Sequence, residues 1–172
     1  KVRSIGKLPS RYVSGGSMCG IPAWTSIHAT QGQVDDWSRE PDYGICLQTR
    51  RVRALDVDIT DPERAEAIRA FLQQASPFWV TASYRFREDS SKFLILFELD
   101  GEWGKRTLEV NGGIVEFLAA GQQCVVAGTH KEGARYQWTG GGPMALLRLS
   151  GRQFEALWSD LLLTFLKPGG QV

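Results

Sequence analysis

The segment Ala-Leu-Asp-Val-Asp-Ile at residues 54–59 constrains the fold more than any other stretch, because apolar and acidic side chains alternate along it. Strict alternation is typical of a β-strand, in which successive side chains point to opposite faces. Leu55 and Val57 therefore share one face, while Asp56 and Asp58 share the other with their Cα atoms about 7 Å apart. The sequence predicts a buried strand that carries two carboxylates on a single face.

Two ionised carboxylates among apolar neighbours are costly unless a cation offsets their charge. A hard divalent ion, which prefers oxygen ligands, is one explanation for the pair Asp56 and Asp58. The alternative is the end of a strand, where both acids are solvated or cap the following helix. The Asp-x-Asp pattern by itself is too short to decide between these two interpretations.

The length and composition of the chain are those of one domain, residues 1–172, because 172 residues that are 42% hydrophobic suffice for a substantial core. No apolar run approaches the roughly 20 residues that span a membrane. We expect a cytoplasmic protein, in a bacterial or phage-infected host cell, with no membrane partner and no signal peptide. The chain starts at Lys1 rather than Met, so we expect a domain excised from a longer protein.

The net charge and the cysteines exclude several classes of protein. A net charge of +1 argues against a domain that grips duplex nucleic acid by bulk charge, although a local basic groove stays possible. Cys19, Cys46 and Cys124 are far apart and form no Cys-x-x-Cys motif, so neither a zinc site nor a disulfide framework is indicated. We expect buried free thiols in a reducing compartment.

The order of the predicted elements indicates an α+β fold with mixed or antiparallel sheets and flanking helices. After an irregular lead-in at 1–29, the predicted helices lie at 30–39, 60–76 and 150–166. Strands are predicted at 43–47, 54–59, 79–85, 92–98, 108–110, 114–118, 123–126 and 136–138, with a loop at 140–143. We expect strands 43–47 and 54–59 to form a hairpin.

Other residues with functional chemistry lie in predicted strands and turns. Glu116 lies inside an apolar strand, where it is either a ligand or an acid that faces water. His130 ends a strand in a Gly-Thr-His turn, where a loop histidine bonded to backbone is the alternative. Arg85 and Lys92 place cations on a hairpin, and solvated strand edges are the usual role of such residues.

Taken together, these segments resemble the primase-polymerase domain of the archaeo-eukaryotic primase superfamily, in its phage- and plasmid-type branch. The resemblance runs from about Leu8 to Trp138. Residues 54–58 look like the Asp-x-Asp first motif of that family, and Val115-Glu116 looks like its third motif. The segment 122–130, Gln-Gln-Cys-Val-Val-Ala-Gly-Thr-His, continues to Tyr-Gln-Trp at 136–138 and resembles the stretch that follows the third motif.

The resemblance implies a DNA primase or polymerase that works in replication of a phage, prophage or plasmid, on a catalytic core with an RRM-like unit. It implies that two Mg²⁺ or Mn²⁺ ions are held by three acids: Asp56, Asp58 and Glu116. It implies contacts to the incoming triphosphate from Arg85, Lys92 and His130. Nucleoside triphosphates and a single-stranded DNA template with its primer are the implied partners, with a helicase domain in the full-length protein.

Some residues depart from the family pattern or have weaker roles. The usual second motif has Ser-x-His, whereas this chain has Ser-Ser-Lys at 90–92 with Arg85 upstream, as in a branch that carries Arg and Lys instead. Either Lys92 or His130 takes the place of that histidine. Weaker candidates for contact with the template backbone are Arg51 and Arg53. Trp103 or Tyr136 could stack on a base, although such aromatics more often belong to a core.

Rival functions come from other classes of protein. Paired acids and a lysine also serve metal-dependent nucleases, which hydrolyse phosphodiesters. A non-catalytic replication module would bind single strands without any need for the acids or for divalent ions. A purely structural domain is the third alternative.

Overall fold

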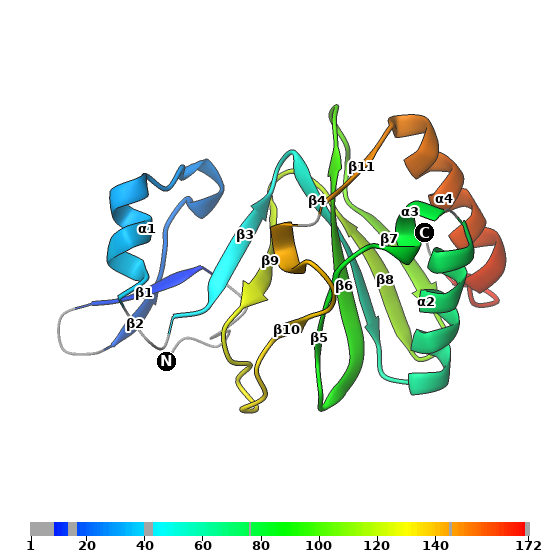
Figure 1. Ribbon diagram of the computed structural model, residues 1–172, viewed down its shortest axis with the longest axis horizontal. Helices are drawn as coiled ribbons and strands as arrows, with labels where there is room; N and C mark the ends of the chain where they lie inside the picture. Colours follow the sequence, from blue (N-terminus) through cyan, green and yellow to red (C-terminus); the bar gives the residue numbers. More distant parts are fainter. Residues whose placement is uncertain (1–8, 14–16, 40–42, 76, 145, 171–172) are drawn as a thin grey trace.

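The computed structural model describes residues 9–13, 17–39, 43–75, 77–144 and 146–170 (Figure 1). Its centre is a large sheet in the strand order β10-β5-β6-β4-β8-β7, in which all neighbours along this path are antiparallel. These strands are β10 (Gln137–Trp138), β5 (Tyr84–Arg87), β6 (Ser90–Leu99), β4 (Val52–Ile59), β8 (Gly113–Leu118) and β7 (Arg106–Val110). Strand β11 (Leu147–Leu149) joins β6 in parallel. The predicted α+β class is therefore confirmed.

Helices cover one face of this sheet (Figure 1). They are α2 (Pro62–Ala75), the short α3 (Pro77–Val80) and α4 (Gly151–Phe165). The large apolar side chains of β4, such as Leu55 and Val57, are at most 1% exposed and pack with Ile68 of α2 and Phe154 of α4. The alternation in the sequence thus places the apolar face of β4 in the main core.

A two-stranded antiparallel ribbon covers part of the other face. It consists of β3 (Ile45–Thr49) and β9 (Gln122–Ala127). Cys124 and Val126 of β9 are buried with Ala54, Leu94 and Leu96 in a second, smaller core. The carboxylate face of β4 is therefore covered at its Ala54 end by this ribbon.

The predicted hairpin between residues 43–47 and 54–59 is wrong, because β3 pairs with β9 and β4 pairs with β6 and β8. Both edges of β4 are occupied by long apolar strands, so β3 turns away at Arg50 and Arg51 into the second layer. The predicted strand at 79–85 is partly wrong. Trp79 belongs to α3 and packs edge-on against Phe97, and the strand begins only at Tyr84. Pro77 favours the short helix α3 over a strand, since proline suits the first turn of a helix.

The N-terminal segment contains more regular structure than the irregular lead-in that was predicted. Strands β1 (Ser10–Tyr12) and β2 (Met18–Gly20) form a small antiparallel pair, followed by the 3₁₀ turn η1 (Trp24–Ser26). Helix α1 (Gln31–Trp37) lies within the helix predicted at 30–39 and begins with a capping box, in which Thr30 and Gln33 exchange hydrogen bonds. Part of the predicted lead-in, residues 1–8 and 14–16, lies outside the described residues.

The remaining predictions agree closely with the structure. Helix α4 begins after Ser150, whose side chain forms a second capping box with Gln153. Strands β6, β7, β8, β9 and β10 include most of the residues predicted for them. The strand β11 and the 3₁₀ turn η2 (Gly142–Met144) were not predicted. Cys19, Cys46 and Cys124 are free, but only Cys124 is buried as expected, whereas Cys19 and Cys46 are partly exposed.

Gly113 is the position at which a small substitution should damage the sheet most. It pairs with Ile59, has φ +153°, and an added Cβ would collide with the carbonyl oxygen of Asp58. We expect Gly113→Ala to lower the free energy of unfolding by well over about 1 kcal/mol, because backbone must move. Gly104→Ala is the matched control, since a Cβ there meets nothing within 4 Å. Equal urea denaturation midpoints for the two variants would contradict this account.

Candidate active site

A single lateral row of side chains crosses the large sheet and brings two acids together. In the register of the strands, Arg85 lies opposite Leu94, Leu94 opposite Asp56, Asp56 opposite Glu116, and Glu116 opposite Thr107. Directly opposed residues of antiparallel strands place their side chains on the same face, with Cβ atoms about 4.5–5.5 Å apart. Asp56 and Glu116 are therefore neighbours, although 59 other residues separate them in the chain.

Asp58 completes a group of three carboxylates on this face. It lies two residues beyond Asp56 on β4 and opposite Ile114 of β8. The side chains of Asp56 and Glu116 are 30% and 19% exposed, so solvent reaches both acids from one side only. The predicted strand acid Glu116 thus lies with the Asp-x-Asp pair.

Each of the three carboxylates has its own cationic neighbour. Lys92 forms an ion pair with Asp58, and Lys105 forms one with Glu116. Asp56 is served less well, because the nearest Arg85 nitrogen is 4.0 Å from its Oδ1. The carboxylate with the weakest partner is therefore Asp56, which adjoins both of the other acids.

Burial raises the pKa of Asp56 to about 6, because the ionised form loses solvation among apolar neighbours. The Arg85 guanidinium opposes this rise, while the negative charges of Asp58 and Glu116 add to it. A carboxyl whose pKa lies so far above its ordinary range is short of positive charge. An additional cation at this position would relieve the deficit.

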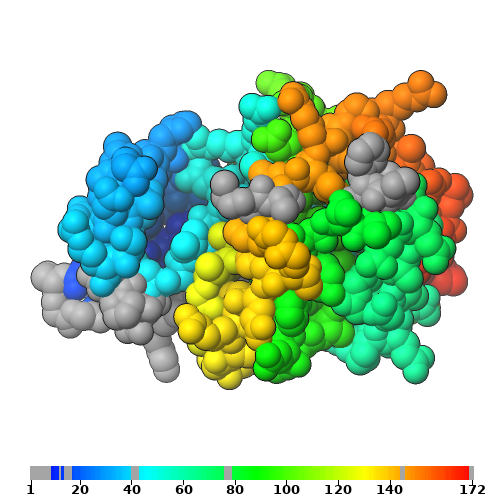
Figure 2. Space-filling model, viewed as in Figure 1, coloured from blue at the N-terminus to red at the C-terminus, as the bar shows by residue number. Residues whose placement is uncertain are grey.

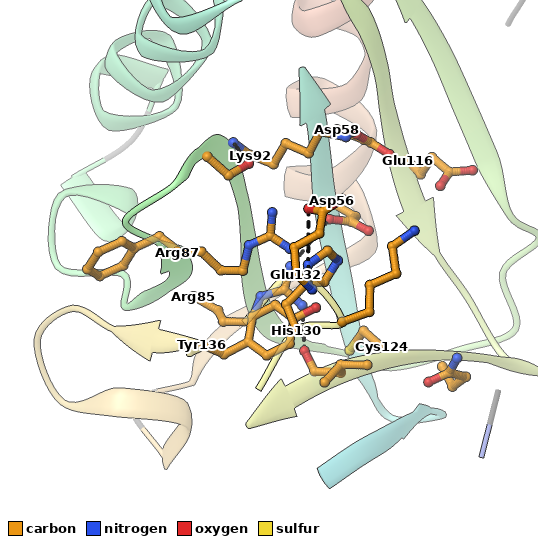
Figure 3. Close-up of a pocket in the computed structure, with 15 residues that line it drawn as sticks. Asp56, Asp58, Arg85, Arg87, Lys92, Glu116, Cys124, His130, Glu132 and Tyr136 are labelled. Atoms are coloured by element: carbon orange, nitrogen blue, oxygen red, sulfur yellow. Dashed lines mark hydrogen bonds and ion pairs between the residues drawn. The ribbon is translucent and has the colours of Figure 1, made fainter. Parts of the chain in front are cut away.

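Arg85, Arg87 and His130 form a basic wall that faces the acids across the pocket (Figure 3). Lys131, the neighbour of His130 in the chain, also lines the pocket. The ring of Tyr136 supports the basic wall, with the guanidinium carbons of Arg85 and Arg87 at 4.6 and 5.9 Å from the ring centroid. The main chain helps as well, because Arg85 donates a hydrogen bond to the carbonyl of Val125. Tyr136 therefore positions arginines in the pocket, which is a different role from the base stacking considered for it.

His130 lies at the rim of this wall, with its ring edge-on to Tyr136 at 6.1 Å. Desolvation lowers the pKa of His130, and the positive charge of Arg87 lowers it further. The imidazole is therefore mostly neutral at pH 7, with one N–H to donate. His130 and Lys92, the two candidates for the missing family histidine, both line the pocket.

The pocket between the acids and the basic wall has a volume of about 440 Å³. The large sheet forms its floor through β4, β5, β6 and β8, and β9 with the following turn forms its side. Figure 2 shows this turn, in yellow, packed directly beside the green β5–β6 segment. Among the residues that line the pocket, four acids face four permanently cationic side chains: Asp56, Asp58, Glu116 and Glu132 against Arg85, Arg87, Lys92 and Lys131.

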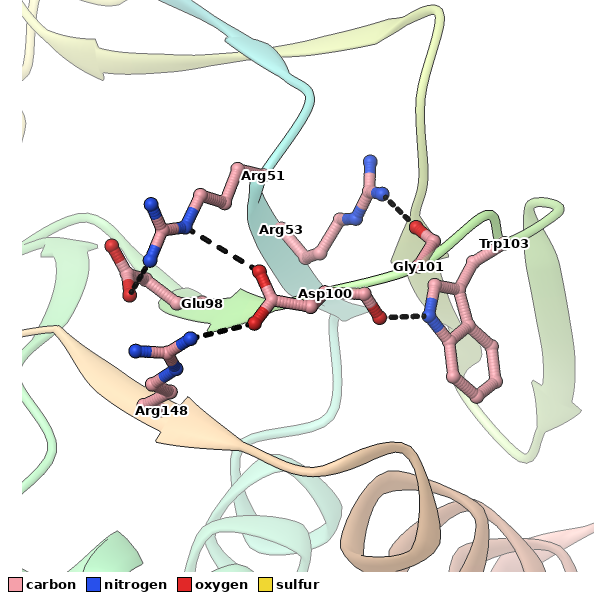
Figure 4. Close-up of polar contacts among 7 residues, drawn as sticks. All are labelled: Arg51, Arg53, Glu98, Asp100, Gly101, Trp103 and Arg148. Carbon is pink, nitrogen blue, oxygen red and sulfur yellow. Dashed lines mark hydrogen bonds and ion pairs between the residues drawn. The ribbon is translucent and has the colours of Figure 1, made fainter.

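The weaker candidates Arg51 and Arg53 lie outside this pocket, near the other end of β4 (Figure 4). Arg53 is only 4% exposed and donates to the carbonyl of Gly101 at 3.0 Å. Arg51 pairs with Glu98 and Asp100 at 3.4 and 3.5 Å. The structure does not bring these two arginines together with the acids.

The positions of two residues could not be predicted from the sequence. Lys105 precedes β7 without any local pattern, and only the β7–β8 register places it beside Glu116. Trp103, a candidate for base stacking, packs edge-on against Phe154 at 5.1 Å and bonds to the carbonyl of Asp100. Its role in the core could be predicted only once α4 is known to cover this end of the sheet.

A ready-made metal centre is not present. Within the residues that the structure describes, no three His, Cys, Asp or Glu side chains are gathered closely enough to hold an ion as they stand. The chemistry of the donors nevertheless suits Mg²⁺ or Mn²⁺, because three carboxylates share one face and the middle one lacks positive charge. Lysines hold Asp58 and Glu116, so these carboxylates would have to exchange an ammonium for an ion.

Comparison with known proteins gives one match, to a protein family. The sequence model of the family described as "Bifunctional DNA primase/polymerase, N-terminal" matches residues 6–149, which is most of the chain. No curated protein and no solved structure matches. In the described part of the chain, no helix is long and apolar enough to cross a membrane.

The raised pKa of Asp56 predicts how stability depends on pH in the metal-free protein. The folded state holds this proton more tightly than the unfolded state does. Protonated Asp56 therefore stabilises the fold fully below about pH 4, and this stabilisation is lost as pH rises through about 6. Asp56→Asn should therefore match the wild type near pH 4 and exceed its free energy of unfolding by about 1–3 kcal/mol at pH 7.5.

Urea denaturation in a chelator at several pH values measures this difference. Asp160→Asn, at an exposed position of α4, is the control and should leave the pH dependence unchanged. A variant at Asp56 that is less stable than the wild type at pH 7.5 would show that its carboxylate is well compensated in the fold.

Proposed function

The chain belongs to the family of bifunctional DNA primase/polymerase N-terminal domains, and from this premise we propose a specific reaction for its pocket. The pocket joins a nucleoside triphosphate to the 3′ end of a primer on a single-stranded DNA template, with release of pyrophosphate. The observation that carries this proposal is the meeting of three carboxylates and a basic wall in one cavity.

The acids Asp56, Asp58 and Glu116 would hold two Mg²⁺ or Mn²⁺ ions. When bound, such ions activate the attacking 3′-oxygen and neutralise charge on the leaving pyrophosphate. The protein itself keeps the carboxylates on one face and excludes water from Asp56 on the core side. Its own residues therefore supply position and charge, which is most of what phosphoryl transfer requires from a protein.

The charge balance of the pocket supports a substrate that arrives with divalent ions. Four acids and four cations already offset one another among the lining residues. Two divalent ions would add about four positive charges, roughly the negative charge that a nucleoside triphosphate brings. A bare polyanion would gain much less, because the lysine and arginine charges are partly used by Asp56 and Asp58.

The basic wall has groups that suit a triphosphate. Arg85 and Arg87 can each form two parallel hydrogen bonds to phosphate oxygens. Arg85 would use Nη2 for this, because that nitrogen lies 4.0 Å from Oδ1 of Asp56 and is only loosely paired with it. Lys92 acts as a point charge, and neutral His130 donates one hydrogen bond.

The wider setting follows from the phage- and plasmid-type resemblance of residues 54–58 and 122–138. It supports a role in replication of a phage, prophage or plasmid, with a helicase domain as a partner. Both are proposals about the full-length protein.

Primer extension tests the role of the acids. We expect Asp58→Ala to lower the rate of nucleotide incorporation at least about a thousandfold, because several kilocalories of charge stabilisation are lost. The far-UV circular dichroism should stay that of the wild type, since Asp58 is half exposed. Asp160→Asn should extend at the normal rate.

The same assay separates the rival functions. The labelled primer lengthens under this proposal, whereas shortening in Mn²⁺ would indicate a nuclease. A non-catalytic replication module would not extend the primer. It would bind single-stranded DNA with an affinity that depends neither on Asp58→Ala nor on divalent ions. Normal extension by Asp58→Ala would contradict the assignment of the acids.

Steady-state kinetics test the role of Lys92. Lys92→Ala should raise KM for the nucleotide about tenfold, which corresponds to one lost charge-assisted contact of about 1.4 kcal/mol. Mn²⁺ binding should be retained, because the three carboxylates stay in place. Lys167→Ala serves as the control, because it removes a lysine that pairs with Glu109 and does not line the pocket. An unchanged KM for the nucleotide in Lys92→Ala would indicate that Lys92 is an ordinary solvated residue at a strand edge.

A further inference from the structure

Lys105 pairs with an acid of the site, although it belongs to none of the sequence motifs and does not line the pocket. Its ammonium pairs with Oε1 of Glu116, and its side chain is 44% exposed. Lys105 precedes β7, the outermost strand on the side of the sheet away from β5 and β10. It therefore approaches the acids from the flank opposite the basic wall.

The lysine also connects two hollows of the surface. Glu116 lines the pocket of the acids, whereas Lys105 lines a second, shallow hollow of about 500 Å³ at the β7–α4 edge. Thr107, the register partner of Glu116, lines that second hollow as well. The ion pair between Lys105 and Glu116 thus lies between the two hollows.

The pair is suited to exchange. The lysine of this salt bridge is 44% exposed although Glu116 is only 19% exposed, and a salt bridge near the surface contributes about 1 kcal/mol, so Lys105 can leave at a small cost. If Glu116 binds a divalent ion, its oxygens coordinate the ion instead of the lysine, and the positive ion repels the ammonium, because like charges repel at short range. Lys105 must then find another anion near the β7 flank.

The geometry of phosphoryl transfer indicates which anion this is. The attacking and leaving oxygens lie roughly in line on opposite sides of the transferred phosphorus. If the pyrophosphate leaves toward the basic wall at Arg85 and His130, the primer end arrives from the opposite flank. That flank is where Lys105 and Thr107 lie.

We propose that Lys105 is an exchangeable counter-ion, which holds Glu116 in the metal-free protein and contacts a backbone phosphate of the primer strand once Glu116 binds a divalent ion. This inference rests on the proposed function of the same site. It assigns Lys105 to primer binding, apart from the nucleotide contacts of the basic wall.

Mn²⁺ binding without nucleotide or DNA tests the first half of the proposal. Lys105→Met removes the competing ammonium and keeps the length of the side chain. We expect Mn²⁺ to bind Lys105→Met about two- to fivefold more tightly than the wild type by isothermal titration, the range that a weak ion pair allows. Lys105→Arg keeps the charge and should stay near the wild type.

Primer binding tests the second half. With saturating Mn²⁺ and no nucleotide, Lys105→Met should bind a labelled primer–template severalfold more weakly in fluorescence anisotropy. The slope of log K against log salt should fall in magnitude by about 0.7–0.9, as expected for one lost phosphate contact. In extension assays KM for the primer should rise, while KM for the nucleotide should stay the same.

Lys167→Met is the matched control, because Lys167 also pairs with a glutamate on the β7–β8 side, Glu109, at 2.7 Å. If the wild type binds Mn²⁺ and extends primers but Lys105→Met behaves like Lys167→Met, the inference about Lys105 is overturned and the proposed function stands. If the wild type neither binds Mn²⁺ nor extends primers, the proposed function fails, and the inference with it.

Discussion

The register between β4 and β8 is the constraint on which the rest of the site depends. On the core face, Leu55 lies opposite Phe117 and Val57 opposite Val115, and all four are at most 1% exposed. A slip of one residue would turn these apolar side chains to the outside, so burial fixes the pairing strongly. The same register places Asp56 opposite Glu116 on the other face. Hydrophobic burial thus determines where the carboxylates meet.

The carboxylate face is held together by internal counter-ions. Lysines neutralise the two outer acids, and Arg85 only partly serves the middle one. Such an arrangement lets a domain fold without bound ions while it keeps three acids on one face of the sheet. In the proposed function, binding of ions and of a polyanionic substrate then replaces contacts that are individually weak.

Local patterns in the sequence predicted what local physics determines. Alternation predicted β4, and the starts of α1 and α4 were predicted at Thr30 and Ser150, which the structure shows to be helix caps. Strand partners depend on contacts distant in the chain, so the expected hairpin between β3 and β4 was wrong. Six charged or titratable residues of the pocket were predicted because they lie in short motifs: Asp56, Asp58, Arg85, Lys92, Glu116 and His130. Three other charged residues that line it were not predicted: Arg87, Lys131 and Glu132. Lys105 was not predicted either, because only the position of β7 beside β8 gives it a carboxylate.

The most direct test of the central claim is the anomalous scattering of Mn²⁺ in a crystal soaked with the ion and a nucleoside triphosphate. The account predicts anomalous peaks within coordination distance of oxygens from Asp56, Asp58 and Glu116, about 2.0–2.3 Å, with the triphosphate against the basic wall of Arg85. Peaks that touch none of these three acids, or a triphosphate bound elsewhere on the molecule, would contradict it.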